Sequence, residues 1–426
     1  MRTFLSVVAS LLIMTPTNIA NAQTVEDELG HLLETHPQLE SARNKKDARG
    51  DRISEARSNF LPQVDLLGDI GRENIDKPAV PSTDLTRKSA RLRLTQNLFS
   101  GFRNPGNLNV ARIDELLAGH DVTSTTQTLL FRGYEIYLDV LATRELRELA
   151  GENVSNIQTQ LTLEDERVKR GAGASIDVLF AKSRLQVAKE NQVFFRGRFD
   201  DALVRFQRVF GRPARLAEMR QPELPDPLIP ATLEEALETA RNNNPSLQIA
   251  EALIDRASEE ETIAAADFLP AVDFVAESNF EDDFDGTRGL RRDYFVGLRA
   301  RWKLFSGFGT QAAVAAAKQN KAAFQNEAFD ARRGVEEDVG RAWENMATAN
   351  ERVDLLENAV GIAGEVFDAR KRLREQGRDT EVNVLDAQQE FFRAQIQLVE
   401  AQFVARVARY RLLQAMGTLT PENMGL

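Results

Sequence analysis

Residues 98–102 read Leu-Phe-Ser-Gly-Phe, and the same five residues stand again at 304–308. Upstream of each copy, at 60–62 and at 268–270, the chain reads Phe-Leu-Pro. Both pairs are separated by about 200 residues, and such ordered self-similarity indicates an internal repeat. The sequence therefore predicts two tandem copies of one structural unit.

Long helices are predicted after each copy of Leu-Phe-Ser-Gly-Phe. Pro is absent from residues 106–212 and from residues 271–420, and Pro in a helix interior costs about 3 kcal/mol. Good helix formers such as Ala, Leu, Glu, Gln and Arg dominate both windows. We therefore expect long helices at about 105–170 and 309–376, each followed by a tight turn and a last helix.

The repeats divide the chain into an ordered series of segments. The first repeat is expected at 23–211, with a β-hairpin at about 61–99. The second is expected at 232–426, with a β-hairpin at about 269–304. Between them, residues 212–231 contain five of the 14 Pro residues and form a predicted linker. Each repeat then reads helix, hairpin, long helix, turn and helix.

The hairpin segments alternate between apolar and charged residues. Leu92 and Leu94 flank Arg93, for example, and Asp65 lies between two apolar residues. A period of two with one apolar face is typical of a half-buried strand. The charged residues that we assign to the inner face are Asp65, Arg91, Arg93, Asp273, Arg299 and Arg301.

Two interpretations fit this alternation equally well. The hairpins are either soluble, with one face on a core, or they have the apolar-out and polar-in pattern of outer-membrane barrels. Four strands cannot close a barrel, because single-chain barrels begin at about eight strands. Hairpins that enter a membrane would therefore require several chains to share one barrel.

The first 22 residues are typical of an export signal. Arg2 gives a positive start, residues 4–14 are apolar, and residues 20–22 read Ala-Asn-Ala, which fits a signal-peptidase site. A transmembrane anchor needs about 20 apolar residues, and Pro16 interrupts the run. We therefore expect the mature chain to begin at Gln23.

Composition excludes several classes of function. The formal net charge of −11 argues against a nucleic-acid partner, because binding to nucleic acid requires a basic surface that neutralises its phosphates. The absence of Cys excludes disulfides and Cys-ligated zinc, and three His leave little for an imidazole site. No nucleophile–base pair, phosphate loop or metal motif stands out. We therefore expect neither an enzyme nor a cofactor.

Taken together, the repeats, the flanking motifs of each hairpin and the turn-plus-helix segments at 171–179 and 377–388 resemble the TolC-type outer-membrane efflux and secretion channels. The resemblance implies a mainly α fold with a β-barrel portion. It further implies a homotrimer with a twelve-stranded barrel in the bacterial outer membrane, standing on a long periplasmic α-helical barrel. The linker would then lie in the equatorial region of the helical barrel. The implied partners are outer-membrane lipid, an inner-membrane pump of the ABC or RND type, and a periplasmic adaptor.

The resemblance also implies a gate at the periplasmic tip. By position, Asp177 and Asp386 would ring the entrance, although Asp177 equally fits a helix N-cap or first-turn acid. Asn383 stands where the family often has Asp, and Arg374 where it often has Tyr, so the locking contacts must use different partners. The tip turns would comprise Gly171, Gly173, Gly377, Arg378 and Asp379, with Asp379 where the family often has Arg.

The first functional hypothesis is thus a passive exit duct for small molecules or for type I protein secretion. The alternative is a periplasmic adaptor or coiled-coil scaffold with soluble hairpins. The acidic run at 281–285 is expected to lie in the second hairpin loop. Its spacing does not match a calcium loop, so we interpret it as a solvated loop.

Overall fold

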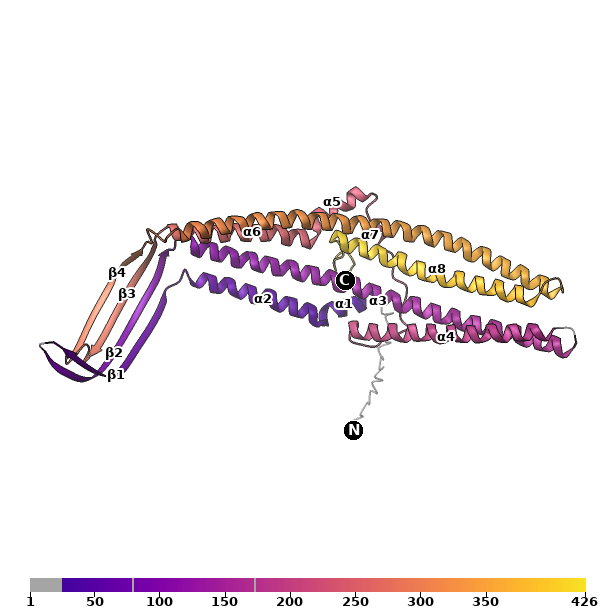
Figure 1. Cartoon of the computed structure of the whole chain (residues 1–426), viewed down its shortest axis with the longest axis horizontal. Coiled ribbons are helices and arrows are strands. Elements are labelled where there is room, and N and C mark those ends of the chain that lie inside the picture. The colour runs from indigo at the N-terminus through magenta and orange to yellow at the C-terminus, as the bar shows by residue number, and fades with distance from the viewer. Residues whose placement is uncertain (1–24, 79, 172–173) are drawn as a thin grey trace, which may run out of the picture.

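The computed structural model describes residues 25–78, 80–171 and 174–426. The predicted signal peptide and Gly173 lie outside the described residues. The described chain is long and narrow, with a β-sheet at one end and the tips of two helix pairs at the other (Figure 1). Helix α1 (Val25–Thr35) and the C-terminus both lie near the middle of its length (Figure 1).

The same order of elements occurs twice, which confirms the predicted fold class. The first half contains α1 (Val25–Thr35), α2 (Pro37–Ser58), β1 (Gln63–Lys77), β2 (Val80–Phe99), α3 (Arg103–Lys169) and α4 (Ser175–Phe210). The second half contains α5 (Leu233–Asn243), α6 (Pro245–Ala265), β3 (Ala271–Asp282), β4 (Leu290–Arg301), α7 (Gly309–Glu375) and α8 (Glu381–Met416). Short 3₁₀ turns lie at Asp226–Leu228 and Ala266–Phe268. The two long helices α3 and α7 both contain 67 residues.

The four strands form one antiparallel sheet in the order β1-β2-β3-β4. The two halves are therefore joined side by side through β2 and β3. Both outer strands, β1 and β4, have a partner on one side only within the described chain.

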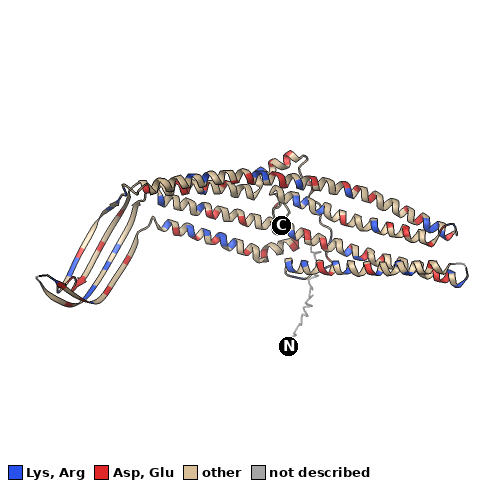
Figure 2. Cartoon of the chain, in the orientation of Figure 1, with Lys and Arg blue, Asp and Glu red and all other residues tan. Residues whose placement is uncertain are grey.

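The register sorts the side chains of the sheet onto two faces. Asp65 lies opposite Arg93, which lies opposite Glu277, while Asp273 lies opposite Arg299. We call the face that carries these residues the charged face. The residues between them form the apolar face, among them Val64, Leu66, Ile70, Leu92, Leu94, Val296 and Leu298. Acidic and basic residues alternate from strand to strand across the sheet (Figure 2).

Leu-Phe-Ser-Gly-Phe forms the corner between a strand and a long helix. Gly101 has a φ of +64°, and a Cβ placed there would lie 2.5 Å from the carbonyl oxygen of Ala266 in the other half. Phe102 also has a positive φ, at 72°. Only glycine adopts this conformation and this close approach without strain, which explains why Gly stands at this point of the motif.

The main hydrophobic core lies at the middle of the long helices, where α3, α4 and α8 meet α1 and α5. Tyr134 of α3 and Tyr410 of α8 stack there, with ring centroids 4.0 Å apart, and both are almost fully buried. A Cβ at Gly133 would lie 2.4 Å from Cδ2 of Leu29. This glycine therefore lets α1 approach α3 closely.

Candidate functional site at the helical tip

The two turns at the helical tip are built around glycines. Gly171 and Gly377 have φ values of +75° and +72°. After α7, the N–H of Arg378 donates to the carbonyl of Leu373 over 2.9 Å, and the N–H of Gly377 donates to the carbonyl of Arg374 over 3.0 Å. This is a Schellman motif, which ends a helix through a left-handed residue.

Asp379 organises the start of α8. One oxygen, Oδ1, accepts from the N–H of Thr380 over 2.8 Å and from the side-chain amide of Asn383, and Oδ2 accepts from Arg370 over 2.9 Å. The Oγ1 of Thr380 caps the helix by accepting from the N–H of Asn383. Hydrogen bonds from Asn383, Arg370 and Thr380 lower the pKa of Asp379 to about 2. Asn383, in the first turn of α8, thus helps to hold the tip turn in place.

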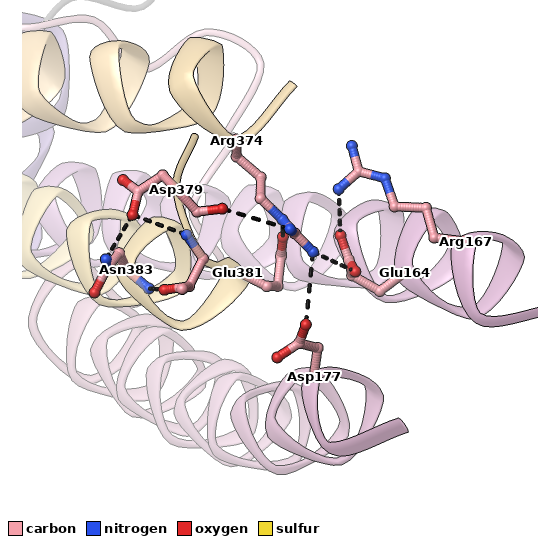
Figure 3. Close-up of polar contacts among 8 residues, drawn as sticks. Glu164, Arg167, Asp177, Arg374, Asp379, Glu381 and Asn383 are labelled. Atoms are coloured by element: carbon pink, nitrogen blue, oxygen red, sulfur yellow. Dashed lines mark hydrogen bonds and ion pairs between the residues drawn. The ribbon is translucent and has the colours of Figure 1, made fainter. Parts of the chain in front are cut away.

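Arg374 lies between three carboxylates from three other helices (Figure 3). Its Nη2 is 2.8 Å from Oε2 of Glu164 on α3 and 3.6 Å from Oδ2 of Asp177 on α4. Its Nε is 3.3 Å from Oε2 of Glu381 on α8. Arg167 adds a second guanidinium, 2.8 Å from Oε1 of Glu164. We call these five residues the tip cluster, and Arg374 is the group that joins all four helices.

The centre of the tip cluster is buried, which strengthens the interactions between its charges. The side chains of Glu164 and Glu381 are each 1% exposed, and that of Arg374 is 19% exposed. Burial, followed by the neighbouring carboxyl of Glu164, raises the pKa of Glu381 to about 7. Oε1 of Glu381 has no hydrogen-bond partner among the described residues. Protonation of Glu381 removes its repulsion from the carboxylate of Glu164.

Farther from the turns, two ion pairs connect α4 to α8. Arg184 lies 2.6 Å from Asp386, and Arg198 lies 2.7 Å from Glu400. The two arginines are as far apart along α4 as their acidic partners are along α8. The two ion pairs therefore follow one another along the contact between these helices. Asp386 therefore lies apart from the tip cluster and has a basic partner on the neighbouring helix, while Asp177 is a first-turn acid that also contacts Arg374.

Sequence reasoning named Arg374 and Asp177 but missed the two most buried members, Glu164 and Glu381. Acidic residues are frequent on every helix of this chain, and most of them are solvated. The one available signal was that Arg374 and Glu381 lie seven residues apart across the turn.

The charged face of the sheet contains a second polar network. Oε1 of Glu277 lies 2.8 Å from Nε of Arg93 and 3.3 Å from Nη2 of Arg299. Arg91 donates to Asn279 over 2.8 Å. The remaining predicted residues lie on the same face: Asp65 opposite Arg93, Asp273 beside Asn97, and Arg301 opposite Ala271. On the apolar face, by contrast, Leu66 is 74% exposed and Val296 is 68% exposed.

Within the described parts of the chain, no helix is both long enough and apolar enough to cross a membrane. Those same residues contain no cluster of acidic or His side chains with the geometry of a metal site. The two polar networks above are thus the strongest candidate sites.

A family model described as "Outer membrane efflux protein" matches residues 29–212 and 236–418, which is most of the chain. The chain belongs to the outer membrane efflux protein family. The two matched segments correspond to the two halves seen in the fold, and membership places the protein in the outer membrane. It also favours the channel hypothesis over the periplasmic adaptor.

Relatives of this efflux protein cover nearly its whole length. Outer membrane efflux protein BepC of Brucella suis is 23% identical over 417 residues, covering 96% of this chain and 88% of the relative. Outer membrane protein TolC of Escherichia coli is 26% identical over 410 residues, covering 92% and 81%. A crystal structure of a membrane protein from Pseudomonas aeruginosa superposes with a TM-score of 0.82 at 17% identity, over 93% of this chain and 91% of that one. The latter likeness shows the fold.

Proposed function

We propose that three copies of this efflux protein form a passive exit duct across the outer membrane. Each copy would contribute its four strands to a twelve-stranded barrel, with the helices below forming a periplasmic tunnel. The observation that carries the proposal is the open sheet. Among the residues that the structure describes, it has two edges without partners and a broad exposed apolar face, and in lipid both features require neighbouring copies to close the ring.

The repeat predicts how neighbouring copies would pair. In the repeat alignment, Arg299 on β4 corresponds to Arg93 on β2, and Asp69 on β1 corresponds to Glu277 on β3. Arg93 and Glu277 form an ion pair inside one copy. The same pairing between copies would set Arg299 against Asp69 of the next copy.

A second pair of positions gives the same register. Lys303 corresponds to Asn97, and Asp65 corresponds to Asp273. Inside one copy, Asn97 donates to Asp273 over 2.8 Å. Between copies, the matching positions would bring a lysine to an aspartate, so the charges are complementary at both places.

The strand–helix corners support this closure as well. Gly101 packs against the carbonyl of Ala266, whereas the equivalent Gly307 has a similar φ of +62° but no described residue within 4 Å of an added Cβ. A neighbouring copy in the predicted register would bring Ser58, the counterpart of Ala266, to this empty corner.

The outer helices of each copy also have apolar stripes without partners. In the tip half, α4 packs mainly on α3 and α7 on α8, and no other described helix packs closely on the far sides of α4 and α7. Exposed apolar residues recur on them at spacings of four and seven, as in coiled coils. They are Ile176, Phe180, Val187 and Phe194 on α4 and Leu355, Ile362 and Val366 on α7.

The duct would be passive and gated at its periplasmic end. Energy would come from an inner-membrane pump of the ABC or RND type through a periplasmic adaptor, and the cargo would be small molecules or an exported protein. The tip cluster joins α3 and α4 to α7 and α8, so separation of the two helix pairs must break the contacts of Arg374 with Glu164 and Asp177. The pairs Arg184–Asp386 and Arg198–Glu400 would add to this lock.

The raised pKa of Glu381 predicts that opening depends on pH. In the closed tip this carboxyl keeps its proton up to about pH 7, whereas its ordinary pKa is 4.5. The closed state thus binds more protons than an opened one, and it loses stability as the pH rises from about 4.5 to about 7. The ratio of open to closed tips should rise by up to about tenfold per pH unit in this window and be flat outside it.

Planar bilayers with purified protein test both the duct and its gate. We expect discrete conductance steps without any nucleotide, with an open probability that rises between pH 4.5 and pH 7. Glu381→Gln should remove the pH dependence, while Glu375→Gln, at an exposed position on the end of α7, should keep it. Absence of any conductance would contradict the duct. An unchanged pH profile in Glu381→Gln would contradict the role of the tip cluster.

A further inference from the structure

The loop between β3 and β4 lies over the neighbouring hairpin of the same copy. Residues 283–289 form an ordered turn: the N–H of Gly289 donates to Oδ1 of Asp283 over 2.9 Å, and the N–H of Asp283 donates back to the carbonyl of Gly289 over 3.2 Å. We call these residues the strap.

Two side chains fix the strap to the first hairpin. The guanidinium carbon of Arg87 lies 4.3 Å from the ring centroid of Phe284, which is a cation–π contact. Asp69 and Glu73 hold the same guanidinium at 3.2 and 3.3 Å. Two carboxylates therefore orient Arg87 beneath the ring of Phe284.

A close backbone approach and an ion pair complete the attachment. A Cβ at Gly286 would lie 2.8 Å from Oγ1 of Thr83 and 3.6 Å from Cδ1 of Ile75. Nζ of Lys77 lies 3.2 Å from Oδ1 of Asp285. The strap thus reaches from β3 across β2 to β1.

The strap crosses the charged face of the sheet. By the strand register, Arg87, Thr83 and Ile75 lie on the same face as Asp65 and Arg93. The strap contacts the sheet at the hairpin end that is far from the helices (Figure 1). On the proposed function, this face lines the lumen, and this end is the outer mouth.

We propose that the strap narrows the outer mouth of the duct, and that its contacts with Arg87, Thr83 and Lys77 set the size of solute that can leave. Three copies bring three straps to one opening. With the straps attached, the mouth passes slender solutes, and wider cargo requires Phe284 to leave Arg87. The inference rests on the proposed function, because it needs the charged face to line a lumen.

Two glycines of the strap give a matched test. Gly286→Val places a side chain against Thr83 and should lift the strap. Gly289→Val strains the backbone in the same loop, with a φ of +104°, but nothing lies within 4 Å of an added Cβ there. Phe284→Ala removes the cation–π contact without backbone strain, and so serves if Gly286→Val fails to assemble.

The measurement is conductance in planar bilayers with graded polyethylene glycols added on the extracellular side. All variants are made in an Arg374→Ala background, so that the periplasmic tip does not limit the current. Gly286→Val and Phe284→Ala should admit larger polymers and conduct more than the background alone, while Gly289→Val should match the background. If the largest polymer that enters is the same for all four proteins, the strap does not restrict the outer mouth. A background protein without conductance would instead contradict the duct itself.

Discussion

Arg374→Ala should open the periplasmic tip. The substitution leaves the carboxylates of Glu164, Asp177 and Glu381 without the guanidinium that joins them, and two of these are 1% exposed. Removing one partner of a buried ion pair costs about 3–5 kcal/mol. The helices relieve that cost by separating, which returns the carboxylates to water. In the proposed trimer, the closed state is thus weakened in every copy.

Two measurements check this prediction. In planar bilayers, Arg374→Ala should show a higher conductance and a larger open fraction than the unmodified protein. In cells, it should increase sensitivity to a large hydrophilic antibiotic that the outer membrane excludes. Arg372→Ala is the control, because this exposed arginine on the same turn of α7 forms no ion pair among the described residues. Equal behaviour of the two variants would mean that the tip cluster is not the lock.

Leu66→Arg should prevent assembly in the membrane, whereas Leu67→Arg should be tolerated. The two leucines are neighbours on β1 and are 74% and 56% exposed, but they point to opposite faces of the sheet. An arginine facing lipid near the middle of a barrel costs about 2–4 kcal/mol, and the proposed trimer would bear this cost in every copy. At position 67 the new charge would lie between Asp65 and Asp69 on the charged face.

The amount of folded protein in the outer-membrane fraction checks this pair. We expect little for Leu66→Arg and near-normal amounts for Leu67→Arg. The reverse result would place the charged face toward lipid and shift the proposed register by one residue. Equal tolerance of both changes would favour soluble hairpins.

The internal repeat could be predicted because its motifs consist of residues that are neighbours in the sequence. Leu-Phe-Ser-Gly-Phe needs a glycine where the chain turns from strand to helix, and the structure shows that corner at Gly101. The two faces of the sheet were predictable for a similar reason, since side-chain direction alternates strictly along a strand. Patterns that depend on neighbouring residues can be found in a single sequence.

The tip cluster could not be found in this way. Glu164 and Glu381 are 217 residues apart in the sequence and come together only because four helices meet at the tip. From sequence, each is one of 65 acidic residues on a chain with many solvated helix faces. The pairing of Asp386 with Arg184 was missed for the same reason, because it depends on how α4 and α8 lie against each other.

The most direct test of the shared barrel is cross-linking between copies. The predicted register sets Leu298 of one copy opposite Ile70 of the next, as Leu92 lies opposite Ser278 within one copy. Opposite residues on antiparallel strands have Cβ atoms about 4.5–5.5 Å apart, which is near the reach of a disulfide. The chain contains no Cys, so the two introduced cysteines are the only thiols of this protein that can form a disulfide. On oxidation of Ile70→Cys/Leu298→Cys in outer membranes, we predict covalent dimers and trimers, nothing larger, and a return to monomers on reduction. Monomers alone under oxidation, or a ladder that continues beyond three copies, would contradict a barrel shared by three chains.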